Sequence, residues 1–234
     1  MVVFFQLVVI FILSNHIYAF DNYDIYFLGI PIIEVNMESN NHELDFQTKS
    51  RGIFSSIWTV ENNYYTRYDS ITYGIRYYSK TVQQGNYSGG LNCEYVDEKL
   101  VLKCDKIEIA VNDSIQNIFT LLAQLSYKTP NYLDSKWFRM NHEGMDYKAR
   151  FLFIGTEEIE VNNSNILCEH YKLDLVKIHS SSSQLSPWDY FTDNIGSQDA
   201  LRQLWVETGS GRKKIIKASV SLYGMVMTAE INNY

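Results

Sequence analysis

Four of the five histidines could act as bases or metal ligands, but their surroundings favour neither role. His142 precedes Glu143, yet the second histidine of a zinc-binding H-E-x-x-H helix is missing and Gly144 indicates a turn. His170 alternates onto the polar side of a strand, where we expect a surface histidine. His42 and His179 are isolated, and no C-x-x-C pair occurs. The sequence therefore predicts no metal site.

Nucleophile and phosphate-binding motifs are also missing from the sequence. There is no G-x-S-x-G, and the Gly-Ser-Gly run at 209–211 indicates a hairpin turn. Asp189, Asp193 and Asp199 fit no EF-hand spacing, and we interpret them as solvated charges in a surface loop. We therefore predict no catalytic residue and no cofactor, and we favour a protein without enzymatic activity.

The overall charge restricts the classes of partner. The chain has 20 Lys+Arg against 27 Asp+Glu, a formal net charge of −7. Nonspecific nucleic-acid binding needs clustered positive charge to displace counterions. We therefore predict no nucleic-acid partner.

Aromatic side chains are the strongest functional signal, with 18 Tyr, 12 Phe and 4 Trp. Apolar ligands are usually held in pockets lined by such side chains. The alternative is that tyrosine is simply a good strand residue with a polar tip. If a groove exists, we expect it to be lined by residues of one helix and of two aromatic segments: Trp58, Ile115, Phe119, Leu122, Trp188 and Phe191.

Alternation of apolar and polar residues predicts that most of the chain forms strands. Leu44, Phe46 and Thr48 alternate with charged or amide residues, and residues 216–222 and 225–231 alternate around Gly224 as a terminal hairpin. We expect a mainly β fold, with a single curved antiparallel sheet or half-barrel and one covering helix.

The covering helix is predicted over residues 113–127. Its apolar residues form a single stripe, and Asp113 with Gln116 resembles a capping box. Such a helix most naturally lies on the apolar concave face of the sheet. A short second helix over 197–203 is an alternative to continuous loop, and residues 180–196 are expected to form a long surface loop.

The three cysteines bear on disulfide pairing and on whether the protein occupies an oxidising compartment. A hairpin with a four-residue loop at 97–100 would place Cys93 opposite Cys104 as a non-hydrogen-bonded pair, close enough for a disulfide. The alternative is two reduced, half-buried thiols. Cys168 is left over as a core cysteine.

Residues 1–19 resemble a secretory signal peptide. Val2 to Leu13 is an apolar run of twelve residues broken only by Gln6, shorter than the ~20 residues that span a bilayer. We expect cleavage after Ala19 and one β-rich domain over 20–234, which would not be integral to a membrane. The protein would be exported, and periplasmic if its source is a Gram-negative bacterium. An uncleaved N-terminal anchor is the alternative.

Short motifs in a fixed order resemble the DUF3108 family of exported bacterial proteins over residues 23–231. They are Tyr26-Phe27-Leu28-Gly29-Ile30, Arg51-Gly52-Ile53-Phe54-Ser55, Asp113-Ser114-Ile115, Gly144-Met145-Asp146-Tyr147, Gly155-Thr156-Glu157, Cys168-Glu169-His170-Tyr171, Leu204-Trp205-Val206 and Gly224. The resemblance implies a curved antiparallel sheet with helical cover, similar to carriers that shelter acyl chains. It transfers no catalytic residues.

Two functions remain open. We favour a structural or interaction module of the cell envelope, whose apolar face is filled by its own side chains and whose partner is another envelope protein. The alternative is a carrier that binds a lipid or another apolar small molecule in a groove of the sheet.

Overall fold

The computed structural model describes residues 18–178, 185, 189–232 and 234, with residues 190 and 191 described in their backbone alone. The strands are β1 (Ala19–Phe27), β2 (Ile30–Ser39), β3 (Glu43–Ser50), β4 (Val60–Tyr68), β5 (Ile75–Gln84), β6 (Tyr87–Val96), β7 (Val101–Cys104), β8 (Ile107–Ala110), β9 (Trp137–His142), β10 (Met145–Val161), β11 (Ser164–Lys177), β12 (Leu201–Glu207), β13 (Ile215–Leu222) and β14 (Met225–Ile231). The helices are α1 (Phe54–Ile57), α2 (Ile118–Tyr127), α3 (Pro130–Leu133) and α4 (Tyr190–Gly196), with a 3-10 turn η1 (Asp97–Lys99).

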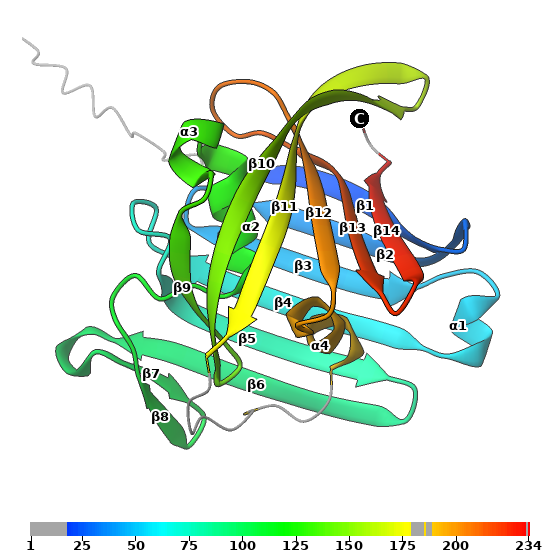
Figure 1. Cartoon of the computed structure of the whole chain (residues 1–234). Helices are drawn as coiled ribbons and strands as arrows, with labels where there is room; N and C mark the ends of the chain where they lie inside the picture. The colour runs from blue at the N-terminus through cyan, green and yellow to red at the C-terminus, as the bar shows by residue number, and fades with distance from the viewer. Residues whose placement is uncertain (1–17, 179–184, 186–188, 233) are drawn as a thin grey trace, which may run out of the picture.

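All fourteen strands belong to one antiparallel sheet, which confirms the predicted fold class. Its order is β8-β7-β6-β5-β4-β3-β2-β1-β14-β13-β12-β11-β10-β9. Each strand lies beside its sequence neighbours except β8 and β9, which are separated by the whole sheet, and β14 returns to pair with β1. The sheet is not closed, because β8 and β9 form its two edges. Figure 1 shows the first half, β1 to β8, crossed by the second half, β9 to β14.

Alternation within the strands positions the core. In β4, Val60, Asn62, Tyr64, Thr66 and Tyr68 are buried, and the residues that alternate with them are exposed or half-buried. Four strand pairs also contain a register shift, including the β1–β2 pair at Ile25/Tyr26. Such β-bulges bend a strand and increase its twist. The curvature lets the two halves of the sheet face each other.

Helix α2 lies between the two halves and is buried along most of its length. The prediction that it begins at residue 113 is wrong, because the helix begins at Ile118. Asn117 is the N-cap, and its side chain accepts a hydrogen bond from the Thr120 N–H while the Thr120 hydroxyl accepts one from the Asn117 N–H. The preceding backbone is extended: the Ile115 carbonyl accepts from the Ile75 N–H, and Gln116 bonds to Arg139 and Asn141 of β9. These bonds to both halves of the sheet prevent residues 115 and 116 from joining the helix.

The segment between β11 and β12 differs from the predicted surface loop. Residues 190–196 form α4, and residues 201–207 form strand β12 where a helix over 197–203 was an alternative. Arg202 explains the boundary between α4 and β12. Its buried guanidinium donates hydrogen bonds to the carbonyls of Ile195, Ser197 and Ala200. The bond to Ile195 satisfies a carbonyl at the C-terminal end of α4, and the other two hold the segment that leads from α4 to β12.

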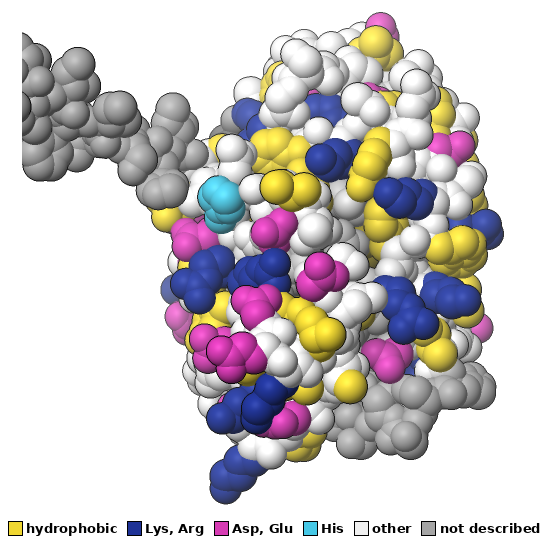
Figure 2. Space-filling view, turned by 90° about the vertical axis from the view of Figure 1, so that its left-hand side faces the viewer, with side chains coloured by type: hydrophobic (Ala, Val, Ile, Leu, Met, Phe, Trp, Pro, Cys, Tyr) yellow, Lys and Arg dark blue, Asp and Glu magenta, His cyan; other side chains and the backbone are white. Residues whose placement is uncertain are grey.

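The charge on one side of the molecule and the character of its helices bear on its partners. The side turned to the viewer in Figure 2 mixes lysine and arginine with aspartate and glutamate. Among the described residues, none of the helices has both the length and the apolar character needed to cross a membrane.

Cys93 in β6 pairs directly with Cys104 in β7, and the two residues form a disulfide with their Cα atoms 4.0 Å apart. Residues 97–100 form the connecting loop. Cys168 in β11 is a buried free cysteine, and burial raises the pKa of its thiol to about 12.

We predict that protein recovered from an oxidising compartment has one reactive thiol. Cys168 should react slowly while the protein is folded, because its thiolate is disfavoured at neutral pH, and quickly after denaturation. The measurement is a thiol titration in denaturant without reductant. Three reactive thiols would contradict the disulfide, and peptide mapping that finds Cys168 bridged would contradict the pairing.

Candidate functional site

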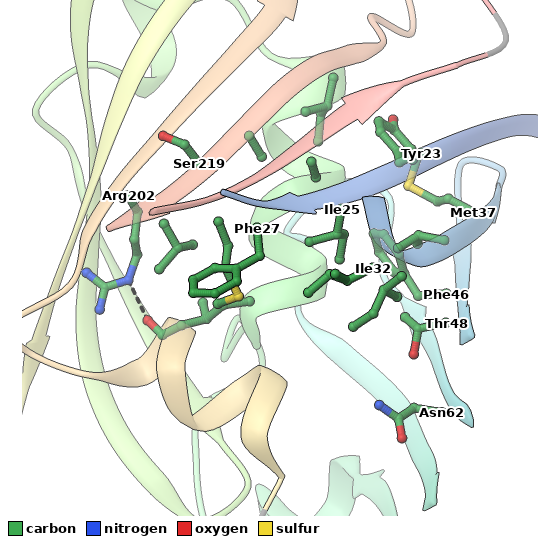
Figure 3. Close-up of a pocket in the computed structure, with 18 of the residues that line it drawn as sticks. Tyr23, Ile25, Phe27, Ile32, Met37, Phe46, Thr48, Asn62, Arg202 and Ser219 are labelled. Atoms are coloured by element: carbon green, nitrogen blue, oxygen red, sulfur yellow. Dashed lines mark hydrogen bonds between the residues drawn. The ribbon is translucent and has the colours of Figure 1, made fainter. Parts of the chain in front are cut away.

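An apolar cavity of about 310 Å³ lies between the two halves of the sheet. Its walls come from β1 to β4 on one side and from β11 to β14 on the other, with α2 and α4 contributing further residues. Figure 3 shows side chains from these elements converging on this space. The volume lies at the lower end of the roughly 300–1,000 Å³ typical of small-molecule sites.

Strand alternation places the apolar residues of the wall. Tyr23, Ile25 and Phe27 are successive inward residues of β1, and Met227 and Ala229 face the same space from β14. In the register of the two strands, Ile25 is opposite Ala229 and Phe27 is opposite Met227. The pairing of β1 with β14 therefore forms the continuous floor of the cavity.

Small residues explain why the cavity is not filled by the protein itself. Ala218 of β13 lies directly opposite Ala229 of β14, and Ser219 follows it in the wall. An alanine pair on neighbouring strands removes the volume that two leucines or valines would occupy in a packed core. The chain thus leaves space between β13, β14 and the residues of α2.

The structure places some of the residues predicted to line a groove in the cavity wall and others elsewhere. Leu122 lines the cavity one helical turn after Ile118, and Trp58 lines it beyond α1. Phe119 points to another side of α2 and contacts the rings of Tyr64 and Tyr78. Ile115 is buried before the helix begins and is also absent from the wall. Trp188 and the side chain of Phe191 lie outside the described residues.

A few polar groups interrupt the apolar wall. The guanidinium of Arg202 lies to one side of the cavity and donates to the Ile195 carbonyl, so the aliphatic part of the side chain faces the wall (Figure 3). Burial lowers the pKa of Arg202 to about 10. Tyr23 Oη and Thr48 Oγ1 are buried and have no hydrogen-bond partner among the described residues. The wall also contains the uncharged polar side chains of Asn62, Gln84, Gln203 and Ser219.

Asn62 and Gln84 connect the cavity to a buried ionic cluster built around Lys80. Lys80 Nζ lies 2.5 Å from Glu143 Oε2 and 3.3 Å from Asp189 Oδ2, and all three side chains are almost fully buried. The three residues come from β5, from the β9–β10 turn and from the position before α4. The cluster therefore joins three segments that are distant in sequence.

Tyrosine hydroxyls and amides complete the cluster. Tyr78 donates to Glu143 Oε1 at 2.8 Å, and Tyr64 and Gln84 donate to Asp189 at 3.0 to 3.1 Å. Burial, together with the neighbouring carboxylates, raises the pKa of both tyrosines well above the usual value. Burial alone would raise the pKa of Asp189, but the Lys80 ammonium and these hydrogen bonds lower it. The cluster holds two acids against one lysine.

His142 borders the cluster without a hydrogen bond. Its Nε2 lies 3.9 Å from Glu143 Oε1, and neither ring nitrogen has a hydrogen-bond partner among the described residues. Burial lowers the pKa of His142, Glu143 opposes that effect, and Lys80 adds to it. The neutral imidazole packs against the rings of Tyr78 and Phe119.

The interpretation of Asp189 as a solvated loop charge is wrong, because its side chain is 1% exposed. The sequence did contain a signal for this cluster. Lys80 is in phase with Tyr78, Val82 and Gln84, the inward residues of β5. A lysine on an inward face requires a buried acid, but the sequence cannot say which one.

His170 also differs from the expected surface histidine. Its ring stacks on Trp205 with the ring centroids 4.5 Å apart, and its Nδ1 lies 2.9 Å from Glu157 Oε1. The side chain is half-buried on the outer face of the sheet because the two flanking strands, β10 and β12, contribute Glu157 and Trp205 as neighbours.

Comparisons with known proteins establish the fold class alone. No family model and no curated protein matches the chain. The chain is similar to the crystal structure of a beta-barrel-like protein of domain of unknown function DUF1849 from Brucella abortus, with 8% sequence identity and a TM-score of 0.55. The match covers 92% of this chain and 95% of that one.

These findings correct the resemblance to DUF3108. No DUF3108 model matches, and the similar solved structure carries a different domain designation. The motifs behind the resemblance are short turn and strand segments, such as Leu28-Gly29 and Gly144-Met145. Turn chemistry of this kind recurs in unrelated antiparallel sheets.

We predict that Lys80→Met destabilises the protein by roughly 3–5 kcal/mol, because two buried carboxylates would lose their cation. The matched control is Lys99→Met, which removes the exposed pair with Glu108 and should change the free energy of unfolding by less than about 1 kcal/mol. Chemical denaturation measures both. Equal small effects would contradict the structural role of the cluster.

We also predict that His142 makes stability fall in mild acid. Its folded-state pKa lies below its unfolded value of about 6.5, so its contribution is present above that pH and is lost as pH falls below it. His142→Gln should reduce the drop in unfolding free energy between about pH 7.5 and about pH 5. His42→Gln on an exposed turn is the control. An unchanged drop in His142→Gln would show that other groups cause it.

Proposed function

We propose that the protein is a non-enzymatic binding module that holds one apolar molecule, of the class of a single acyl chain, in the cavity between the sheet halves. The observation that carries the proposal is the unfilled space of about 310 Å³ with predominantly aliphatic and aromatic walls. Transfer of each methylene group from water into such walls contributes about 0.8 kcal/mol. A ligand with a chain of methylenes therefore suits the site.

The size and composition of the cavity restrict the ligand. A cavity at the lower end of the usual range accommodates one chain or one small apolar molecule. The nearest cation, Arg202, is already engaged by three main-chain carbonyls. The other polar side chains of the wall, including those of Tyr23, Thr48 and Ser219, are uncharged. The proposal is therefore a ligand bound through its apolar portion, with at most a hydroxyl or carbonyl inside the wall.

The cavity also favours binding over the role of an interaction module. An interaction module would fill the apolar face with its own side chains. In this protein Ala218 and Ala229 lie where larger side chains would complete the packing. Ala218, Ser219 and Ala229 line the same cavity as Ile118 and Leu122 of α2.

We further propose that the protein is exported, with cleavage after Ala19, and periplasmic if its source is a Gram-negative bacterium. The apolar segment before residue 20 and the pairing of Cys93 with Cys104 support this location. Cleavage at that point would leave β1 from Phe20 onward in place to pair with β2 and β14.

The proposal predicts that filling the cavity blocks binding without unfolding the protein. Ala218→Leu and Ala229→Leu, as single variants, should weaken binding of an apolar fluorescent probe at least about tenfold, because the added side chains occupy the ligand space. Their unfolding free energy should be equal to or higher than that of the original protein. Mass spectrometry of gently purified protein should find an apolar molecule that both variants lack.

The matched control is Ala110→Leu at the exposed end of β8, which should leave probe binding unchanged. A protein that takes up no probe and carries no ligand would contradict the proposal. Equal probe binding in the two cavity variants would show that the probe binds elsewhere.

A further inference from the structure

Three turns lie together at the end of the sheet that the cavity reaches. Phe27 pairs with Ile30 around the turn between β1 and β2, and Leu222 pairs with Met225 around the turn between β13 and β14. Because Phe27 is also opposite Met227, the two turns are neighbours. The α1 segment joins them, since the Arg51 N–H donates to the Ile32 carbonyl. Phe27 and Phe54 at this end also line the cavity.

These turns expose large apolar side chains to solvent. Ile53 is 84% exposed, Leu28 is 79% exposed and Tyr223 is 78% exposed. Ile30, Ile57 and Met225 are at least half exposed beside them. We call these six residues the apolar rim. Contiguous exposed apolar residues mark interaction sites in stable proteins.

The segments that carry the apolar rim contain no charged residue. Residues 25–33, 52–60 and 218–229 contain no Asp, Glu, Lys, Arg or His, in a chain with 20% Asp, Glu, Lys and Arg. By contrast, the side of the molecule in Figure 2 mixes charges of both signs. Protein interfaces usually have a polar perimeter, whereas charge is costly inside a bilayer. The uncharged turns therefore fit a lipid surface better than a protein partner.

The backbone of two of these turns gives independent support. Leu28 and Tyr223 each occupy the first position of a two-residue hairpin turn, with φ of 51° and 50°, and each is followed by glycine. Asn, Asp and Gly are preferred at that position because bulky residues are strained there. This chain follows the preference at Asp105 and Asn162, which lie in other hairpin turns, and departs from it at Glu143, whose side chain binds Lys80. The apolar side chains at 28 and 223 are therefore present against local backbone preference.

We propose that the apolar rim docks on the surface of a lipid bilayer, from which the cavity takes up its ligand or to which it returns it. The uptake or return of a ligand rests on the proposed function, whereas docking on the bilayer does not require that function. The uncharged turns would enter the interfacial region, and Trp58 beside them would lie between the bilayer surface and the cavity. Attraction would come from apolar burial, because the protein carries a net negative charge.

The experiment uses flotation with vesicles of neutral phosphatidylcholine. We expect the protein to bind, with little dependence on salt. The double variant Leu28→Asn/Tyr223→Asn should partition at least about tenfold less. Its unfolding free energy should be equal or higher, because asparagine suits both turns. The matched control is Leu100→Asn, another exposed leucine with positive φ, located at the β6–β7 loop, which should leave vesicle binding unchanged.

Failure of this inference and failure of the proposed function are distinguishable. Absence of vesicle binding, or equal binding by the double variant, would overturn docking even if the cavity takes up the apolar probe. Loss of docking in the double variant would support docking even if the cavity takes up no probe. Concentration-dependent dimerisation that the double variant abolishes, without vesicle binding, would overturn docking and identify a second copy as the partner.

Discussion

The pairing of β1 with β14 is the interaction on which the rest of the structure depends. Without it, the chain would form two separate meanders, β1 to β8 and β9 to β14. Five residue pairs from Tyr23 with Ile231 to Phe27 with Met227 join them into one sheet. The same pairing places β2 and β13 on either side, so these four strands form the cavity floor. It also brings together the turns that carry the apolar rim.

A buried ionic cluster joins the two sheet halves beside the start of α2, and a buried ion pair of the second half contacts the residue that follows the helix. Near the start of the helix, Phe119 packs on Tyr64 and Tyr78, whose hydroxyls bind the carboxylates paired with Lys80. At the other end, Lys213 donates to the Lys128 carbonyl and to Glu169. A buried ion pair adds little net stability over an apolar replacement, but breaking it is costly. The Lys80 cluster therefore specifies how the halves are placed, and the Lys213 pair fixes the end of α2 to the second half.

The cavity and the apolar rim both depart from what stability alone would favour. Ala218 opposite Ala229 leaves a core unfilled, and Leu28 and Tyr223 strain their turns and expose apolar surface. In both places a common residue would fit better, a larger aliphatic one in the cavity and asparagine in the turns. Departures of this kind are expected at functional sites. Their proximity at one end of the sheet is the reason to interpret them together.

The sequence by itself determined the local structure. Period-two alternation identified antiparallel strands, the terminal hairpin around Gly224 and the facing positions of Cys93 and Cys104, because each depends on residues close in the chain. It also identified the helix, although not its start. The Ile115 and Gln116 backbone is bound to Ile75 and Arg139, and those partners are invisible from positions 113–117.

The tertiary structure alone decided the site. Lys80, Glu143 and Asp189 are at least 46 positions apart along the chain, and no periodicity links them. Asp189 resembled a solvated loop residue because nothing near it in sequence shows that its segment returns to β4 and β5. In the sequence, Ala218 and Ala229 are ordinary strand residues. Only the register of the folded sheet shows that they lie opposite each other, next to Ile25. A cavity is a property of what several strands fail to fill, so only the folded arrangement reveals it.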